Sequence, residues 1–320
     1  MTSAVMRRLP AVFVGLAVWL LPPLLIRDTF VMHLLVLAGI FAILATGLNL
    51  VMGYSGLLSL GHHAFFGLGA YGAALAAAAG LPLIGSIAAG AAAAAVASRL
   101  VGAVLLKLRS AFFVIATIAF AEILRVVSLN WIEVTNGPMG MAGVPPLAVA
   151  LPLLEFDFTT PHRAYYLIWG ILGLTVLVVR HLVGSPMGVG LVAMRESEYV
   201  ARSLGIDTAR LALRSVVIGS TIAGVAGALY GHYLQFVSPD VLTFGVMITL
   251  LVMVLGGGMG TLWGPVVGAA IFTLGPEFLR AGDQYRLLLY GVIIVLLVRF
   301  MPNGLWGTAE NLFRRRTLRV

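Results

Sequence analysis

The sequence predicts an all-α, polytopic membrane protein, and three observations carry that prediction. Of the 320 residues, 61% are hydrophobic and 10% are charged, whereas a soluble globular domain carries roughly 25% charged residues. The apolar residues fall in runs of the length that a membrane helix needs, about 20 residues. The 38 glycines are typical of helices that pack closely inside a bilayer. With no low-complexity linker between the runs, we expect a single membrane domain over residues 1–320.

Ten apolar runs are candidate spans. They cover residues 9–26, 30–52, 58–79, 83–106, 111–130, 163–182, 212–234, 241–258, 263–280 and 286–301. We expect the first to be a retained helix, because no small-residue cleavage pattern follows it. Glycines interrupt the third and the ninth. Whether these two are broken or re-entrant stays open, since irregular backbone at membrane depth needs cover from protein or water.

The basic residues predict that both termini are cytoplasmic. With the N-terminus inside, fourteen arginine and lysine residues fall on the inner side and four on the outer side, and such an excess marks the cytoplasmic side. The inner set is Arg7, Arg8, Lys107, Arg109, Arg180, Arg195, Arg202, Arg210, Arg214, Arg299, Arg314, Arg315, Arg316 and Arg319. The outer set is Arg27, Arg163, Arg280 and Arg286. Asp28, Glu133, Glu155, Asp157, Asp240 and Asp283 also fall outside.

Two long polar connections separate the spans. The outer one, residues 131–162, is rich in glycine and proline and predicts turns. The inner one, residues 184–211, predicts a short amphipathic helix that starts at Met194 or Ser197 and ends at Gly205. Two interpretations stay open: a helix at the lipid boundary or a docking element for a soluble partner.

The segment GYSGLLSLGHHAFFGLGAYG, residues 53–72, allows two hypotheses. Its GYSG resembles the serine motif of rhomboid-type intramembrane proteases, with His62 or His63 as the base. On one helix, however, Ser55 and His62 would lie roughly 10 Å apart, too far for a nucleophile–base pair. The second hypothesis is a bent or unwound stretch along a translocation path. Its candidate residues are Asn49, Gly53, Ser55, Gly56, Ser59, His62 and His63.

Other motifs limit the chemistry. Glu122 and Arg125 predict an ion pair at i, i+3 within one span. The glycine-rich segment LGGGMGTLWGP, residues 255–265, lacks the lysine of a phosphate-binding loop, and the one lysine, Lys107, stands in no such frame. With no cysteine and no metal-binding motif we expect no metal site, and no pattern indicates nucleic-acid binding. The chain is therefore expected not to be an enzyme, and any ATP and Mg²⁺ would be bound by other subunits.

Three segments together resemble the permease subunits of Liv-type (branched-chain amino acid) ABC importers, the M-type subunits in particular. They are LNLVMGYSGLLSLGHHAFFGLGAYGAAL, then SPMGVGLVAMRESEYVARSLGIDTARLAL with STIAGVAGALYGHYLQFVSPD, and LGGGMGTLWGPVVGAA. The resemblance runs from about Leu48 to Leu279 in the expected order. It implies an all-helical fold of about ten spans like that of the vitamin B12 importer-type (type II) permeases, in a bacterial inner membrane.

The resemblance also implies partners: a second, H-type permease, two cytoplasmic ATPase subunits, and a periplasmic or lipid-anchored binding protein that delivers the substrate. Residues 184–211 then resemble the loop that couples to the ATPase. That loop has Ala201 four residues before Gly205, but Tyr199 where the family motif places a glutamate. Its candidate residues are Arg195, Glu196, Glu198, Tyr199, Ala201 and Gly205.

At the outer side, the resemblance makes four residues candidates for an outer gate or for contact with the binding protein. They are Thr135, Asn136, Gly137 and Gly140. Branched-chain amino acids are the expected substrate, with urea, short amides or other small polar solutes as alternatives in the same importer class. Two alternatives belong to other functional classes: a stand-alone carrier or channel, and a rhomboid-like intramembrane protease.

Overall fold

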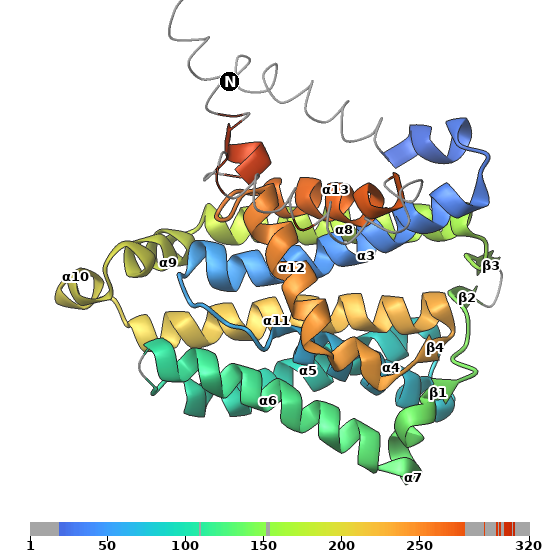
Figure 1. The fold of residues 1–320 in the computed structure, drawn as a ribbon, viewed down its shortest axis with the longest axis horizontal. Helices are drawn as coiled ribbons and strands as arrows, with labels where there is room; N and C mark the ends of the chain where they lie inside the picture. Colours follow the sequence, from blue (N-terminus) through green and yellow to red (C-terminus); the bar gives the residue numbers. More distant parts are fainter. Residues whose placement is uncertain are drawn as a thin grey trace, which may run out of the picture.

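Figure 1 shows a computed structural model of the chain. It describes residues 19–108, 110–151 and 154–278, together with residues 291, 299, 301, 304–308 and 310. The expected spans 9–26 and 286–301 lie largely outside the described residues, as do both termini. The described part is mainly helical, as the sequence predicts.

Within the described residues, five helical stretches are long and apolar enough to cross a membrane. They coincide with the predicted spans 30–52, 83–106, 111–130, 163–182 and 212–234 to within a few residues. They are α3 (Thr29–Asn49) with the π-helix η1 (Leu50–Tyr54), α5 (Leu83–Leu105), α6 (Ser110–Asn130), α8 (Pro161–Val183) and α11 (Thr208–Leu234).

Side-chain caps fix where two of these helices begin. The Asp28 carboxylate accepts a hydrogen bond from the backbone N–H of Phe30 and starts α3. The Asp207 carboxylate does the same for Arg210 and starts α11, four residues before the predicted span. Both carboxylates satisfy N–H groups that have no partner inside the helix.

Three shorter helices complete the described bundle: α4 (His62–Ala78), α12 (Phe244–Gly257) and α13 (Gly264–Phe278). The predicted third span, 58–79, therefore begins in irregular backbone, because the chain is not helical from Ser55 to Gly61. The sequence left open whether glycines break this span; the structure shows one uninterrupted helix, His62–Ala78, that begins four residues later than predicted and follows an unwound segment.

Helices α4, α5 and α11 pack against one another, and α3 lies between α11 and α8, with α12 and α13 against it (Figure 1). Small residues permit the close approach. A Cβ atom on Gly224 of α11 would lie 2.7 Å from the Ala94 Cβ of α5, and one on Gly227 would overlap the carbonyl oxygen of Phe66 in α4. The indole N–H of Trp169 in α8 donates to the Leu35 carbonyl of α3 at 3.0 Å. These contacts confirm the expectation that small residues let the helices pack closely.

The connection 131–162 forms more structure than turns alone. It contains α7 (Ile132–Thr135), the 3₁₀-helix η2 (Gly137–Met139), and the strands β1 (Met141–Ala142), β2 (Ala148–Leu151) and β3 (Leu154–Asp157). Strands β2 and β3 pair antiparallel. Strand β1 pairs antiparallel with β4 (Phe236–Val237), with Met141 opposite Val237 and Ala142 opposite Phe236. The 3₁₀-helix η3 (Pro239–Leu242) follows β4.

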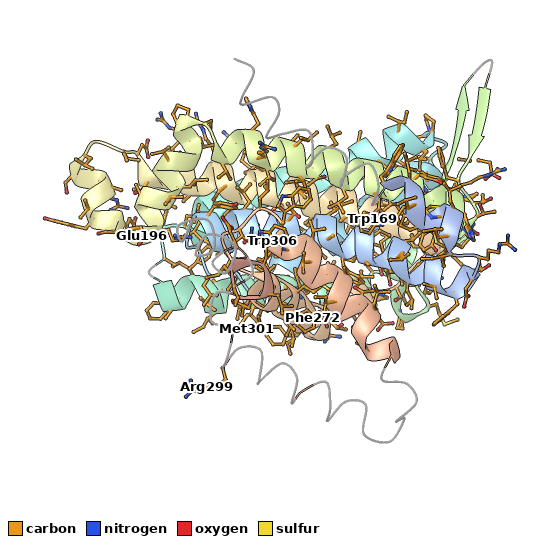
Figure 2. The ribbon with its side chains drawn as sticks, turned by 90° about the horizontal axis from the view of Figure 1, so that it is seen from above. Trp169, Glu196, Phe272, Arg299, Met301 and Trp306 are labelled. Carbon is orange, nitrogen blue, oxygen red and sulfur yellow. The ribbon has the colours of Figure 1, made fainter. Side chains whose placement is uncertain are left out.

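The connection 184–211 contains two helices, α9 (Pro186–Glu196) and α10 (Glu198–Ser203). These helices lie at one end of the molecule and the β-strands lie at the other (Figure 1). Figure 2, seen from above, likewise shows the β2–β3 hairpin projecting from the end opposite Glu196. We refer to these as the α10 end, residues 184–207, and the β end, residues 131–160 with 235–243.

Candidate functional site

The candidate path residues surround a break in the helical backbone. After the π-helix η1, residues 55–61 run without helical hydrogen bonds. The N–H of Leu57 donates to the Val51 carbonyl at 3.2 Å, and the N–H of Leu60 donates to the Thr117 hydroxyl of α6 at 3.1 Å. Backbone groups at membrane depth need such partners because lipid offers none. The unwound segment is therefore stabilised by specific hydrogen bonds. The π-helix before it is also of a kind often found at functional sites.

The serine and the histidines of this segment do not pair with each other among the described residues. The Ser55 hydroxyl donates to the Val51 carbonyl and accepts from the Ser215 hydroxyl at 3.2 Å. His62 and His63 are both 1% exposed. Nε2 of His62 and Nδ1 of His63 have no hydrogen-bond partner in the described part of the chain. This arrangement does not support a serine–histidine nucleophile pair.

Asn49 holds the end of α3 to the glycine-rich turn between α12 and α13. Its amide nitrogen donates to the Thr261 carbonyl at 2.8 Å, and its amide oxygen accepts from the Gly260 N–H at 2.8 Å. Asn49 is 1% exposed. Gly260 has φ of +75°, a conformation that glycine adopts without strain. The sequence made Asn49 a candidate path residue, and in the structure its amide joins α3 to the glycine-rich turn.

Arg195, near the end of α9, reaches the same place from the polar connection. Its Nη1 donates to the Gly53 carbonyl of η1 at 2.8 Å. A Cβ atom on Gly56 would lie 2.8 Å from the Arg195 Cγ, and one on Gly260 would lie 2.8 Å from its Nη1. We call Asn49, Gly53, Gly56, Arg195 and Gly260 the arginine junction. It joins α9, the unwound segment and the glycine-rich turn, which lie far apart in the sequence.

Helix α10 projects from this region with an exposed apolar surface. It begins at Ser197, whose hydroxyl accepts from the Val200 N–H at 3.3 Å, and it ends before Gly205, which has φ of +82°. Both boundaries match the predicted short helix. Tyr199 is 84% exposed and Leu204 is 74% exposed.

The remaining residues of α10 fix it to the molecule. Ala201 is buried. Arg202 pairs with Glu198 at 2.7 Å, and its Nε donates to the Thr208 hydroxyl at the start of α11 at 2.8 Å. Glu196, predicted with this group, ends α9 and pairs with Arg195 at 2.7 Å. The predicted coupling residues therefore divide between α9, α10 and the turn after it.

At the β end, the four predicted outer residues form a hydrogen-bonded turn. The Thr135 hydroxyl donates to the Ser128 carbonyl at 2.7 Å. The Asn136 amide donates to the Gly140 carbonyl at 2.8 Å. A Cβ atom on Gly140 would lie 2.6 Å from the Val237 carbonyl oxygen, and Gly137 begins η2. These residues hold the connection against β4.

The predicted pair of Glu122 and Arg125 forms in the middle turns of α6. Nε of Arg125 donates to Oε2 of Glu122 at 2.9 Å, and a second nitrogen reaches Oε1. The two side chains are 52% and 31% exposed, in that order. The ion pair therefore lies on a face of α6 that the described residues leave uncovered.

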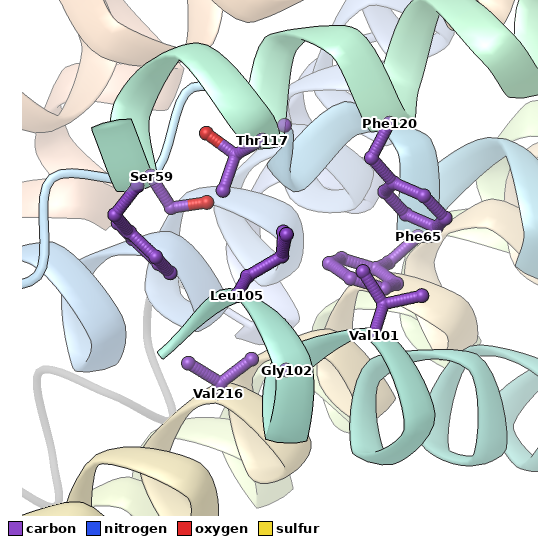
Figure 3. Close-up of a pocket in the computed structure, with 10 residues that line it drawn as sticks. Ser59, Phe65, Val101, Gly102, Leu105, Thr117, Phe120 and Val216 are labelled. Carbon is purple, nitrogen blue, oxygen red and sulfur yellow. The ribbon is translucent and has the colours of Figure 1, made fainter. Parts of the chain in front are cut away.

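Two cavities differ in size. The first lies beside the unwound segment, between Ser59, Leu105, Thr117 and Val216 (Figure 3). Its volume is about 20 Å³, room for about one water molecule. The second measures about 350 Å³ and lies among Phe41, Phe66, Tyr230, Phe236 and Asp240. Sequence reasoning missed this second cavity, because its walls come from α3, α4, α11, β4, η3 and α12 and no motif marks them.

Comparison with known proteins points to one family. A family model described as "Branched-chain amino acid transport system / permease component" matches residues 30–298. The high-affinity branched-chain amino acid transport system permease protein LivM of Salmonella typhimurium is 34% identical over 294 residues, 83% of this chain and 67% of that protein. The Escherichia coli protein of the same name is 33% identical over 292 residues, with the same two shares. The LivH permease protein of Escherichia coli is 30% identical over 128 residues, 39% of this chain and 41% of that protein. No solved structure matches.

Proposed function

The chain belongs to the branched-chain amino acid transport permease family, and from that premise we propose that it forms, with a second permease subunit, the translocation path of an ATP-driven importer in a bacterial inner membrane. The match of the family model over residues 30–298 carries the proposal. The substrate class is branched-chain amino acids, as the names of the relatives state for those proteins. A periplasmic or lipid-anchored binding protein delivers it.

We propose that the whole chain is one domain of ten spans with a vitamin B12 importer-type fold and cytoplasmic termini. Basic residues of the described part support this orientation. At the α10 end, Lys107 follows α5, Arg180 lies in the last turn of α8, and Arg210 lies in the first turn of α11. Arg27 and Arg163 stand at the opposite end, before α3 and in the first turn of α8. Under the positive-inside rule this distribution supports a cytoplasmic α10 end.

Helix α10 is the proposed contact for the ATPase subunits, which bind the ATP and Mg²⁺. Its apolar residues Tyr199 and Leu204 are exposed, although Ser197 and Arg202 anchor the helix firmly on the chain. An ordered helix that keeps apolar side chains in water fits a groove on a partner protein. The chain itself then supplies positioning and movement, while catalysis belongs to the ATPase.

The arginine junction is the proposed link between that contact and the path. A displacement of α9 and α10 moves Arg195, and Arg195 is bonded to the carbonyl of Gly53 in η1. Asn49 ties the same segment to the turn between α12 and α13. Coupling between distant sites runs through rigid elements of this kind. The path beyond the junction follows the unwound segment, past Ser55, Ser59, His62 and His63.

The second permease is proposed to cover the uncovered face of α6. Glu122 and Arg125 form an ion pair there at membrane depth, and charged groups in membrane helices face protein or water rather than lipid. At the β end, the turn of Thr135, Asn136, Gly137 and Gly140 is proposed to receive the binding protein. Thr135, Gly137 and Gly140 are buried and hold the turn, and Asn136 is the exposed residue offered for that contact.

The experiment that tests this function is purification of the importer from native membranes, followed by measurement of leucine uptake in liposomes. We expect ATPase subunits and a second permease to purify with the chain. Tyr199→Asp and Leu204→Asp should release the ATPase and abolish uptake while leaving the chain folded. Ala209→Asp, which adds the same charge in the first turn of α11 at the same end, is the control. ATPase retained by both α10 variants would refute the docking site.

A further inference from the structure

The larger cavity has the size and lining of a site for a small molecule. Its volume of about 350 Å³ lies within the range of roughly 300–1,000 Å³ found for ligand pockets. Phe41, Phe66, Tyr230 and Phe236 form aromatic walls, and Ser238 and Asp240 supply polar groups. A mostly apolar pocket with few polar groups is the usual composition of such a site.

The cavity runs from the β end toward the middle of the bundle. Phe236 belongs to β4 and Asp240 to η3, next to the turn proposed to receive the binding protein. Phe41 lies midway along α3, and Phe66 lies in the first turns of α4, just after the unwound segment. The rings of Phe41 and Phe66 stack at 6.4 Å, and Phe66 meets Tyr230 edge-on at 5.3 Å. Phe41, Phe66 and Tyr230 therefore form one connected aromatic cluster along the inner part of the cavity.

Asp240 leaves a negative charge at this cavity. Asp240 is exposed at the edge of the cavity, and its Oδ2 accepts a hydrogen bond from the Ser238 hydroxyl at 3.1 Å. Within the described residues it forms no salt bridge, whereas the outer carboxylate of Asp157 pairs with Arg163. A carboxylate beside aromatic rings attracts an ammonium group through its charge and through the faces of the rings.

We propose that this cavity binds a branched-chain amino acid in transit, with the substrate ammonium at Asp240 and the branched side chain among Phe41, Phe66 and Tyr230. The proposal rests on the function proposed above and names where this chain meets the substrate. The lining explains the substrate class, since the rings take up an apolar side chain and the carboxylate requires an amine. A site on a transport path must also release its substrate. Asp240 is the one charged residue among the described residues that line the cavity, which favours weak, reversible binding.

The test uses a cysteine introduced into the cavity. The chain has no cysteine, so Val246→Cys, a change of similar volume in the cavity wall, gives it a single thiol. In the assembled importer we expect leucine to slow the reaction of this thiol with a water-soluble maleimide at least several-fold. Thr159→Cys, in the exposed β-end connection, is the control thiol, and leucine should leave its rate unchanged.

Analogues of leucine identify which end of the substrate is recognised. Isopentylamine has the branched chain and the ammonium group, and it should protect the Val246→Cys thiol. The acid 4-methylpentanoate has the branched chain without the ammonium group, and it should not. Equal protection by the two analogues would overturn the role of Asp240.

A second substitution separates Asp240 from the rest of the importer. In the Val246→Cys background, Asp240→Asn should remove protection by leucine and lower the rate of leucine uptake at least tenfold. Asp157→Asn, which removes an outer carboxylate away from the cavity, should change neither. The importer carrying Asp240→Asn should still purify with its ATPase subunits.

Two failures are distinguishable. If the parent importer takes up leucine but leucine never protects the thiol, or if Asp240→Asn transports normally, the cavity is not on the substrate path and the proposed function stands. If the parent importer takes up no branched-chain amino acid, the proposed function fails and the site falls with it.

Discussion

Glycine serves two different purposes in the helix packing of α4, α5 and α11 and in the arginine junction. In the first region, Gly224 and Gly227 sit inside regular helices, where a Cβ atom would strike Ala94 or the Phe66 carbonyl of a neighbouring helix. In the second, Gly56 and Gly260 have positive φ angles outside helices and lie against Arg195. Gly224 and Gly227 have no side chain, which lets neighbouring helices approach closely. Gly56 and Gly260 instead allow the backbone conformation needed where three segments meet.

The difference separates what keeps the chain folded from what is proposed to move. A Cβ atom added at Gly227 would overlap backbone of α4, and no rotamer change relieves such an overlap, so a substitution there must move a helix. The arginine junction instead depends on a few hydrogen bonds from Arg195 and Asn49. Substitutions in the first region should therefore affect folding most. In the second region, replacing Arg195 should affect transport more than folding.

The largest effect is expected for Gly227→Val. The new side chain would overlap the Phe66 carbonyl oxygen, and we expect a loss of about 3 kcal/mol or more in stability because backbone must move. Thermal unfolding of the purified chain measures it. Gly173→Val in α8, where a Cβ atom meets nothing within 4 Å, is the matched control and should change stability by less than about 1 kcal/mol. Equal losses in both would contradict the packing role.

Arg195→Ala should uncouple transport while leaving the fold intact. It removes the hydrogen bond to the Gly53 carbonyl and the contact with Gly56. A hydrogen bond from a charged donor contributes about 1.5–3 kcal/mol, so we expect leucine uptake per ATP hydrolysed to fall about tenfold. Measuring both rates in liposomes gives this ratio. Arg210→Ala, which removes an exposed ion pair with Asp207 at the same end, should leave the ratio unchanged, and an equal drop there would argue for a general effect of charge.

Asn49→Ala should have a smaller effect, mainly on stability. It leaves the Gly260 N–H and the Thr261 carbonyl without their partner, and such loss costs about 1–3 kcal/mol when the groups are buried. The midpoint of thermal unfolding reports the change. Asn130→Ala removes an exposed amide that bonds only within α6 and should be close to neutral. If Asn49→Ala matched it, the clamp between α3 and the glycine-rich turn would be unimportant.

Ser55→Ala is expected to have the smallest effect. Its hydroxyl bonds to Val51 and to Ser215, and Ser215 retains its own bond to the Ala212 carbonyl. We expect a stability change within about 1 kcal/mol and leucine uptake within twofold of the parent. Loss of cleavage of a membrane-embedded peptide in this variant would instead revive the protease hypothesis.

Spans and helix ends were predictable where one local signal decides them. The boundaries of α5, α6 and α8 follow from apolar runs of about 20 residues. Ser197 and Gly205 predicted the limits of α10 because a capping hydroxyl and a left-handed glycine act over a few residues. Helix α9 was missed because Gly188 and Gly190 lower its intrinsic helix propensity. In the structure Gly188 and Gly190 lie tightly against Val183 and Leu211 instead.

The contacts of the candidate site were beyond sequence reasoning. Arg195 meets Gly53 across 142 residues, and Asn49 meets Gly260 across 211 residues. No single-sequence pattern reports such pairs, since each depends on how whole helices pack. The apolar, glycine-rich run of residues 58–79 also left undecided whether it is broken. For Asp240 the sequence predicted only its side of the membrane. The aromatic residues that line the same cavity come from α3, α4, α11 and β4, which no local pattern connects.

The hydrogen bond between Leu60 and Thr117 has a consequence for biosynthesis. The ribosome makes Leu60 57 residues before its acceptor, so the unwound segment is ready to enter the bilayer while α6 is still unmade. An unsatisfied N–H in hydrocarbon costs several kcal/mol. We expect α4 to remain at the lipid–water boundary, or in the translocon, until α6 arrives. The order of synthesis thereby governs when this part of the chain reaches its final depth.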